Sequence, residues 1–340
     1  MLLAWAQQFA EVVYLDSNEY QQEYSSYDFI LAVDALTSIT TDYKDSFKAL
    51  SEYQQQSRDW LFGYLTYDLK NDTELLTSDN FDGLGFPELF FFQPKKLFLL
   101  KGGSVEMHYL RMCDDEVESD WMDINAFALP APEPRARVEI KQRISQERYL
   151  DKAQRMLDYI HRGDIYEANL CMEFYAEDAV INPLETYFSL NDISRPPFAA
   201  YLKNRKHYLM CASPERYLKK EGNKVISQPI KGTARRSADP AEDEAIKASL
   251  AANEKERSEN IMIVDLVRND LSRTATKGSV QVEELCKPYT FKQVHHLIST
   301  ITSDVDSSLL PVQILKSTFP MGSMTGAPKI SAMKIIEELE

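Results

Sequence analysis

The sequence predicts an α+β protein in which mixed or antiparallel β-sheets carry helices on their outside. Two kinds of segment support this class. Short runs rich in aromatic and β-branched residues are typical of strands, and runs with apolar residues at helical spacing are typical of amphipathic helices. The 340 residues are 44% hydrophobic and 11% aromatic, which is ample for a packed interior. At this length, two lobes and one large composite sandwich are both open.

The N-terminal part contains several expected strands. Aromatic and β-branched residues gather in short runs, separated by polar turns and by a helix-like segment at 45–54. The expected strands are residues 28–33, 60–65, 89–92 and 97–100.

A proline-rich segment divides the chain. Pro130, Pro132 and Pro134 alternate with other residues, and this pattern favours an extended linker. We therefore expect three parts, namely an N-terminal region at 1–128, a linker at 129–137 and a C-terminal region at 138–340.

Helices and strands alternate after the linker. Ser145 suits an N-cap, and apolar residues then recur at helical spacing until Gly163. A second helix is expected at 240–270. The expected strands of this part are residues 165–174, 199–202, 208–212, 224–228 and 290–301.

Composition argues against several classes of function. The chain has 38 basic and 53 acidic residues, and its net charge of −15 repels nucleic acid and anionic membranes. No apolar run approaches the roughly 20 residues that span a bilayer, and the first ten residues lack a basic leader. The four cysteines form no C-x-x-C pair, so zinc ribbons and redox dithiols are not expected. We expect a cytoplasmic protein with no nucleic-acid or membrane partner.

A lysine between apolar residues and a glycine is the first candidate for chemistry. Residues 229–233 are Pro-Ile-Lys-Gly-Thr, and we expect a tight turn with Lys231 at its centre. A free lysine titrates near pH ~10.4, but desolvation or a nearby cation such as Arg235 or Arg236 frees its lone pair for attack. Most lysines beside glycine are solvated loop residues, so this segment alone is weak evidence.

A carboxylate is expected near this lysine. Glu215 follows the expected strand 208–212, and Lys231 follows the expected strand 224–228. If the two strands are neighbours, both side chains reach one end of a sheet, and a carboxylate beside an amine is a natural proton-transfer pair. A surface salt bridge is the more common situation for an arbitrary Glu–Lys pair.

Acidic residues on the expected second helix form a candidate metal site. Glu256 and Glu259 are three residues apart and share a helix face. Mg²⁺ takes one or two protein carboxylates and completes its shell with water and substrate oxygens. An exposed charged face is the usual alternative, but the apolar run that begins after Glu259 places this residue at the margin of the core.

A glycine-containing segment at 321–329 precedes a run with helical spacing, and Pro328 suits the first turn of that helix. The amides around Gly326 and Ala327 would then form an anion site at a helix N-terminus. A structural loop-to-helix junction has a similar sequence. His296 lies on a strand-like stretch, where a satisfied core or surface histidine is more common than a catalyst.

The four blocks around Glu215, Lys231, Glu259 and 321–329 resemble, in order and spacing, the chorismate-utilising enzymes. This family includes component I of anthranilate synthase and of aminodeoxychorismate synthase, and the isochorismate and salicylate synthases. The resemblance is strong from about residue 145 to the end and loose before it. It implies the family fold, an α+β sandwich of large mixed or antiparallel sheets with helices packed outside.

Within this family, Lys231 is typical of the aminodeoxychorismate synthases, whereas anthranilate synthases usually carry alanine there. Isochorismate and salicylate synthases place a water-activating lysine in the segment matching 166–170, where this chain has Glu167. The resemblance therefore implies component I of an aminodeoxychorismate synthase, on the path to para-aminobenzoate and folate. An anthranilate synthase component I and a catalytically inactive, partner-binding subunit remain the alternatives.

The resemblance also implies roles for individual residues. Lys231 would add to C2 of chorismate, Glu215 would act as general acid and base, and Glu259 would hold Mg²⁺ against the ring carboxylate. The other matched positions lie near the ring or the leaving group, with His296 among the catalytic residues and the rest binding substrate: Thr233, Thr325, Gly326 and Ala327.

The expected partners are chorismate, ammonia and a glutamine amidotransferase. No cysteine lies in the Gly-x-Cys-x-Gly elbow of a thiol glutaminase, so ammonia would come free or from a separate amidotransferase subunit. The family continues beyond the position matching Glu340, with a second Mg²⁺-binding glutamate and groups for the substrate carboxylates. We therefore expect the C-terminal part of the fold to be missing from this sequence, which leaves an incomplete pocket and exposed sheet edges.

Overall fold

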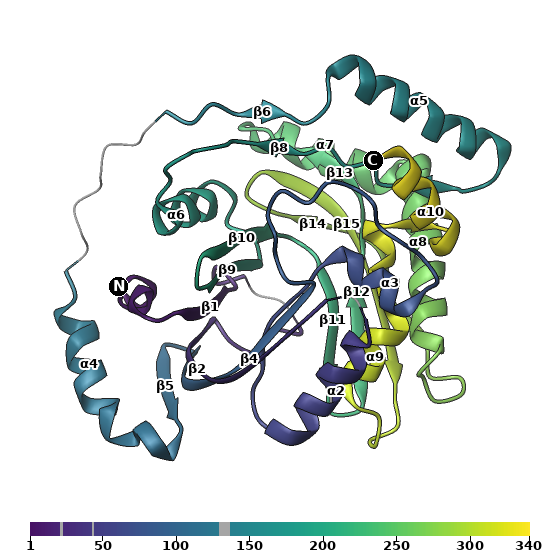
Figure 1. Cartoon of the computed structure of the whole chain (residues 1–340). Helices are drawn as coiled ribbons and strands as arrows, with labels where there is room; N and C mark the ends of the chain where they lie inside the picture. The colour runs from purple at the N-terminus through teal and green to yellow at the C-terminus, as the bar shows by residue number, and fades with distance from the viewer. Residues whose placement is uncertain (21–22, 43, 129–136) are drawn as a thin grey trace.

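The structure of the chain is a computed structural model that describes residues 1–20, 23–42, 44–128 and 137–340. The expected linker at 129–137 lies outside these residues, apart from Arg137. Two antiparallel sheets occupy the centre of the molecule and most helices lie outside them (Figure 1). The predicted α+β class is therefore confirmed. Among the described residues, no helix is long and apolar enough to cross a membrane.

The first sheet has seven strands in the order β10-β9-β1-β2-β4-β3, with β5 paired to β4. Their bounds are β1 Glu11–Asp16, β2 Phe29–Thr41, β3 Phe62–Leu65, β4 Leu89–Lys101, β5 Ser104–Tyr109, β9 Phe198–Asn204 and β10 His207–Ser213. The expected strands 89–92 and 97–100 are two parts of one strand, β4. Because β9 and β10 follow the 129–137 segment, this sheet takes strands from both expected regions, and a domain boundary at that segment remains a prediction.

Both faces of the first sheet are buried. Val12 and Leu31 belong to one apolar cluster with Trp5, whereas their neighbours Val13 and Ala32 belong to a second cluster on the other face. Alternate residues of a strand point to opposite faces, so the strands carry apolar residues at consecutive positions here. The sheet is therefore an interior layer of the molecule.

The second sheet has five strands, β11 Arg216–Glu221, β12 Lys224–Gln228, β13 Ile230–Arg235, β14 Gln281–Thr290 and β15 Val294–Asp304. The predicted strand 224–228 is confirmed as β12. The predicted strand at 290–301 is confirmed only from Val294, where β15 begins, because Thr290 ends β14 and a turn at 291–293 joins the two strands. Strands β12 and β13 follow one another along the same edge of β15.

Two predicted helix ends are confirmed. The hydroxyl of Ser145 accepts a hydrogen bond from the Arg148 amide at the start of one helix, which ends at Gly163 in the left-handed conformation. The expected helix at 240–270 is instead two helices, because Asn253 leaves the helical conformation and its side chain caps the second.

The helices are α1 Leu2–Trp5, α2 Ser46–Ser57, α3 Lys70–Thr73, α4 Val117–Ala126, α5 Gln146–Arg162, α6 Pro183–Ser194, α7 Pro240–Ala252, α8 Glu254–Ser272, α9 Pro311–Thr318 and α10 Lys329–Leu339, with 3-10 turns η1 Ala6–Gln8, η2 Tyr67–Leu69, η3 Arg111–Glu116 and η4 Gly322–Met324.

The prediction of a strand at 165–174 is wrong for most of its length. Only two-residue ladders form there, β7 Glu167–Ala168 with β16 Gly326–Ala327, and β8 Phe174–Tyr175 with β6 Lys141–Gln142. The apolar residues of this stretch, such as Ile165, pack against α5 and α10 rather than within a sheet.

Candidate active site

Lys231 lies in strand β13 at a β-bulge, not in the tight turn that we expected. The register of β13 against β15 shifts between Ile230 and Thr233, and Gly232 adopts a φ of +95°. A bulge adds an unpaired residue and re-aims a side chain. The Lys231 side chain is only 20% exposed, and its Nζ donates a hydrogen bond of 3.4 Å to Oδ1 of Asn169.

The backbone of this bulge is held from α8. Asn260 is buried, and its Nδ2 donates to the carbonyls of Lys231 and Leu297 at 3.0 and 3.1 Å. One hydrogen bond from this buried amide holds the carbonyl of Lys231 on β13, and the other holds the carbonyl of Leu297 on the neighbouring strand β15. Sequence reasoning missed Asn260, although it directly follows Glu259.

The structure brings Glu215 next to this segment. One oxygen, Oε1, accepts hydrogen bonds from the Ile230 amide at 2.9 Å and from the Ser323 hydroxyl at 2.6 Å. Burial raises the pKa of Glu215. The two hydrogen bonds and the charge of Lys231 oppose this rise in pKa. Glu215 is therefore a largely buried carboxyl group that keeps its proton to a higher pH than an exposed glutamate does.

Our reason for expecting this proximity was only partly right. Strands β10 and β12 are not neighbours, because β10 is in the first sheet and β12 is in the second. Glu215 instead lies where the chain crosses from β10 to β11, between the sheets. The crossover and the bulge together place the carboxyl group near the amine.

The cations that we expected to act on Lys231 are engaged elsewhere. Arg235 contacts Glu242 at 3.2 Å, and Arg236 forms two hydrogen bonds with Asp243 on α7. The charged group that faces the lysine is Glu167, whose Oε1 lies 3.6 Å from Nζ. Burial raises the pKa of Glu167, with a smaller contribution from Glu259, while Lys231 lowers it.

Glu259 lies on α8 at the margin of the core, as predicted, with its side chain 38% exposed and 3.7 Å from Lys255. Within the described residues, no group of three or more histidine, cysteine or acidic side chains could hold a metal ion. Mg²⁺ needs only one or two protein carboxylates and prefers oxygen donors. The half-exposed Glu259 carboxylate fits that requirement as a single ligand, and a protein-built cage does not form here.

His296 and Thr233 form a pair across β13 and β15. The Thr233 hydroxyl and Nδ1 of His296 are 2.9 Å apart, and the residues are direct partners in the ladder. Burial lowers the pKa of His296, which favours the neutral ring. The pair follows the bulge that carries Lys231.

The segment at 325–327 is not the first turn of a helix. Gly326 and Ala327 form β16, which pairs with β7, and α10 begins only at Lys329. The side chain of Thr325 is buried and donates to the Met321 carbonyl, within its own loop. The predicted substrate contacts of these three residues stay predictions. The helix expected after this segment is confirmed as α10, with Pro328 at its N-cap rather than in its first turn.

A buried ion pair anchors the same loop. Lys329 Nζ lies 2.5 Å from Oδ2 of Asp270 and also donates to the Thr318 carbonyl. It thereby ties the start of α10 to the ends of α8 and α9. The loop between α9 and α10 carries Ser323, which sequence reasoning missed although it lies inside the 321–329 block.

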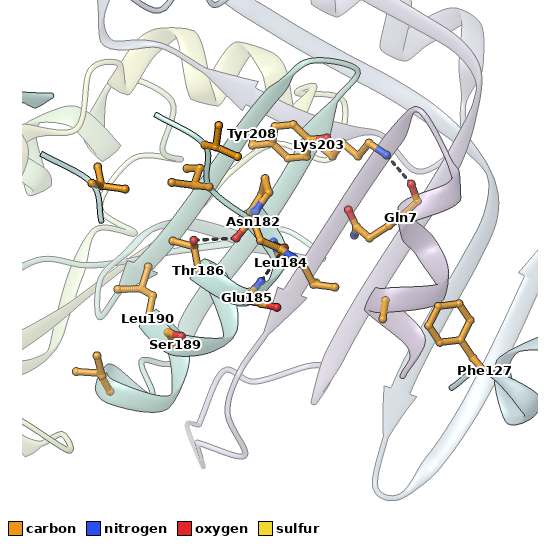
Figure 2. Close-up of a pocket in the computed structure, with 16 residues that line it drawn as sticks. Gln7, Phe127, Asn182, Leu184, Glu185, Thr186, Ser189, Leu190, Lys203 and Tyr208 are labelled. Atoms are coloured by element: carbon orange, nitrogen blue, oxygen red, sulfur yellow. Dashed lines mark hydrogen bonds between the residues drawn. The ribbon is translucent and has the colours of Figure 1, made fainter. Parts of the chain in front are cut away.

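Of two cavities in the described part of the chain, one lies away from these residues and one reaches them. One of about 970 Å³ lies between the N-terminal segment and α6, where Lys203 Nζ donates to the Gln7 carbonyl and Asn182 caps the helix (Figure 2). None of the predicted site residues lines it. A second cavity of about 610 Å³ reaches Glu215 from the side of Phe198.

The sequence of the chain is similar to those of known enzymes. A family model described as chorismate binding enzyme matches residues 10–340. The chain is 39% identical over 220 residues to aminodeoxychorismate synthase component 1 of Escherichia coli, covering 65% of this chain and 48% of that protein. It is 34% identical over 286 residues to anthranilate synthase component 1 of Thermus thermophilus, covering 82% and 62%. The chain thus spans about half the length of these curated relatives.

Solved structures share the fold. Anthranilate synthase component I from Streptococcus pneumoniae matches with a TM-score of 0.79 and 25% identity, over 94% of this chain and 78% of that chain. The menaquinone-specific isochorismate synthase of Escherichia coli matches with a TM-score of 0.71 at 13% identity, over 100% of this chain and 76% of that chain.

Proposed function

This chain belongs to the chorismate-binding enzyme family, and on that basis we propose that it acts as component I of an aminodeoxychorismate synthase. The proposed reaction converts chorismate and ammonia to 4-amino-4-deoxychorismate, the precursor of para-aminobenzoate and folate. The observation that carries the proposal is that Glu215 accepts a hydrogen bond from the amide of Ile230, the residue before Lys231, so that the charge of Lys231 acts on the Glu215 carboxyl group. A lysine nucleophile and a carboxyl group with a raised pKa suit the covalent substitution of a ring hydroxyl.

In the proposed mechanism the uncharged amine of Lys231 attacks C2 of the ring. The C2–N bond forms, the ring double bond shifts, and the C4–O bond breaks while Glu215 donates a proton, so that the hydroxyl leaves as water. Ammonia then attacks C4, the double bond shifts back, and the C2–N bond breaks to release the lysine. Glu215 recovers its proton from the ammonium group of the product.

Other residues support binding in this proposal. Glu259 would hold Mg²⁺, which when bound supplies positive charge for a substrate carboxylate. The neutral His296 ring and the Thr233 hydroxyl would contact the ring near the leaving group. The backbone of Thr325, Gly326 and Ala327 would line the pocket beside Glu167.

The source of ammonia is part of the proposal. Cys113 and Cys286 are buried, and none of the four cysteines has the sequence context of a glutaminase nucleophile. We therefore propose that ammonia is taken up free or is delivered by a separate glutamine amidotransferase subunit. Anthranilate synthase is the second candidate, favoured by the long match to the Thermus protein.

Product analysis separates the two candidates. With chorismate, Mg²⁺ and ammonium, we expect 4-amino-4-deoxychorismate, which keeps the enolpyruvyl group. Formation of anthranilate with release of pyruvate would replace our proposal by the second candidate. We also expect Lys231→Ala to lower the rate by at least about 10³-fold, because the step through the amine is lost. An unchanged rate would remove the lysine from the mechanism.

A further inference from the structure

The carboxylate of Glu167 faces the amine of Lys231. Oε1 lies 3.6 Å from Nζ, and this oxygen is buried without a hydrogen bond among the residues that the structure describes. The two side chains are 15% and 20% exposed, so water has limited access to the space between them. A buried carboxylate oxygen without a hydrogen bond is costly, and such groups are commonly retained for function.

The backbone holds Glu167 in this position. It is paired with Ala327 in the β7–β16 ladder, and the neighbouring amides of Tyr166 and Asn169 donate to the carbonyls of Ala327 and Thr325. The ladder is packed closely, since a Cβ on Gly326 would lie 2.4 Å from the Glu167 carbonyl oxygen. Helices α8 and α10 both contact β16, and α8 also contacts β13. Figure 1 shows the two helices at the right of the view. Glu167 is therefore fixed relative to the bulge that carries Lys231.

The other nearby carboxyl group is unsuited to take the proton of the amine. Oε1 of Glu215 already accepts two hydrogen bonds, and the proposed mechanism needs this group protonated so that it can donate to the leaving hydroxyl. The charged groups that act on Glu167 are Lys231 from β13 and Glu259 from α8.

We propose that Glu167 is a catalytic general base that takes the proton of the Lys231 ammonium before the amine attacks the substrate. This role rests on the function proposed above. The N–H bond of the ammonium breaks and an O–H bond forms on Glu167, which leaves an uncharged amine and a neutral carboxylic acid. Entry of substrate removes water and favours this neutral pair over the ion pair. The two carboxyl groups then have separate tasks, Glu167 as base towards the lysine and Glu215 as acid towards the leaving group.

The test compares the pH dependence of turnover in the protein and in Glu167→Gln. Total ammonium is adjusted so that free ammonia stays constant at every pH. Without the carboxylate, the amine depends on solvent to remove its proton. We expect the variant to be about 10²-fold slower at pH 7, and its rate to rise with pH towards that of the unaltered protein. A merely structural defect would lower the rate at every pH.

Two controls keep the result interpretable. Glu167→Asp retains a base one methylene further away, and we expect an intermediate rate with the pH profile of the unaltered protein. Glu173→Gln removes a carboxylate that pairs with Arg143 instead, and we expect no change. A Glu167→Gln variant that matches the unaltered protein at pH 7, or that is slow without recovery at high pH while Glu167→Asp is equally slow, would overturn the role of Glu167. If the unaltered protein makes no aminodeoxychorismate, the proposed function fails instead.

Discussion

The pKa of Glu215 depends on burial and on two hydrogen bonds, which act in opposite directions. Burial raises its pKa, while the Ser323 hydroxyl and the Ile230 amide lower it through hydrogen bonds to Oε1. A group with a raised pKa stays protonated to higher pH, which suits a proton donor at neutral pH. As a general acid, Glu215 limits activity on the alkaline side, where it loses its proton.

Ser323→Ala removes one of the two hydrogen bonds to Glu215. Because this bond favours the ionised form, its loss raises the pKa of Glu215 further, and we expect the alkaline limb of the pH–rate profile to move to higher pH. The maximal rate should fall roughly tenfold, since a hydrogen bond to a charged group contributes about 1.5 kcal/mol or more. A limb that moves to lower pH would contradict this account of Ser323.

At the scale of secondary structure, one short ladder and one bulge form the site. The β7–β16 ladder joins segments far apart in sequence and places Glu167 beside Ala327. The bulge in β13 places Lys231 opposite this ladder. Neither element has enough residues to be stable alone, so both depend on the packing of α8 and α10 around them.

Gly326→Ala tests this dependence. The new Cβ would lie 2.4 Å from the Glu167 carbonyl and 2.9 Å from Cβ of Ala332, and φ at this position is +150°. We expect a loss of about 3 kcal/mol in the free energy of unfolding, measured by urea denaturation. Gly278→Ala is the matched control, because φ is +80° there but the space around it is open. It should cost only about 1–2 kcal/mol, and equal losses would argue against close packing at β16.

Local features could be predicted from the sequence, whereas contacts between distant segments could not. The Ser145 cap and the strand at 224–228 depend on neighbouring residues, so their signals lie in a short window. Lys231 and Glu215 were found because they lie in recognisable blocks. The turn expected at Lys231 was wrong because Gly232 indicates a positive φ but not that β15 continues beside it.

The contacts that complete the site have no comparable local signal. The hydrogen bond from Ser323 to Glu215 joins residues 108 positions apart. Glu167 and Lys231 face each other because a two-residue ladder forms inside a stretch that we expected to be one long strand. Such contacts follow from the packing of whole elements, which the sequence of one segment does not specify.

At the scale of the whole molecule, the candidate site lies where the two sheets and the C-terminal helices meet. Glu215 is on the crossover between the sheets, Lys231 is on the second sheet, and Glu259 is on the helix that covers it. Lys70, buried on α3, pairs with Glu337 on α10 and ties the N-terminal region to the same end of the fold. The arrangement concentrates a lysine and several carboxylates in a protein of net charge −15.

The central claim is that the amine of Lys231 bonds to the substrate during turnover. The most direct measurement is peptide mass spectrometry after the protein is mixed with chorismate and Mg²⁺ in the absence of ammonia. We expect the peptide that contains Lys231 to gain the mass of chorismate less one water, and to lose that mass when ammonium is added. A Lys231 peptide that stays unmodified, in a protein that still converts chorismate when ammonium is present, would contradict the account.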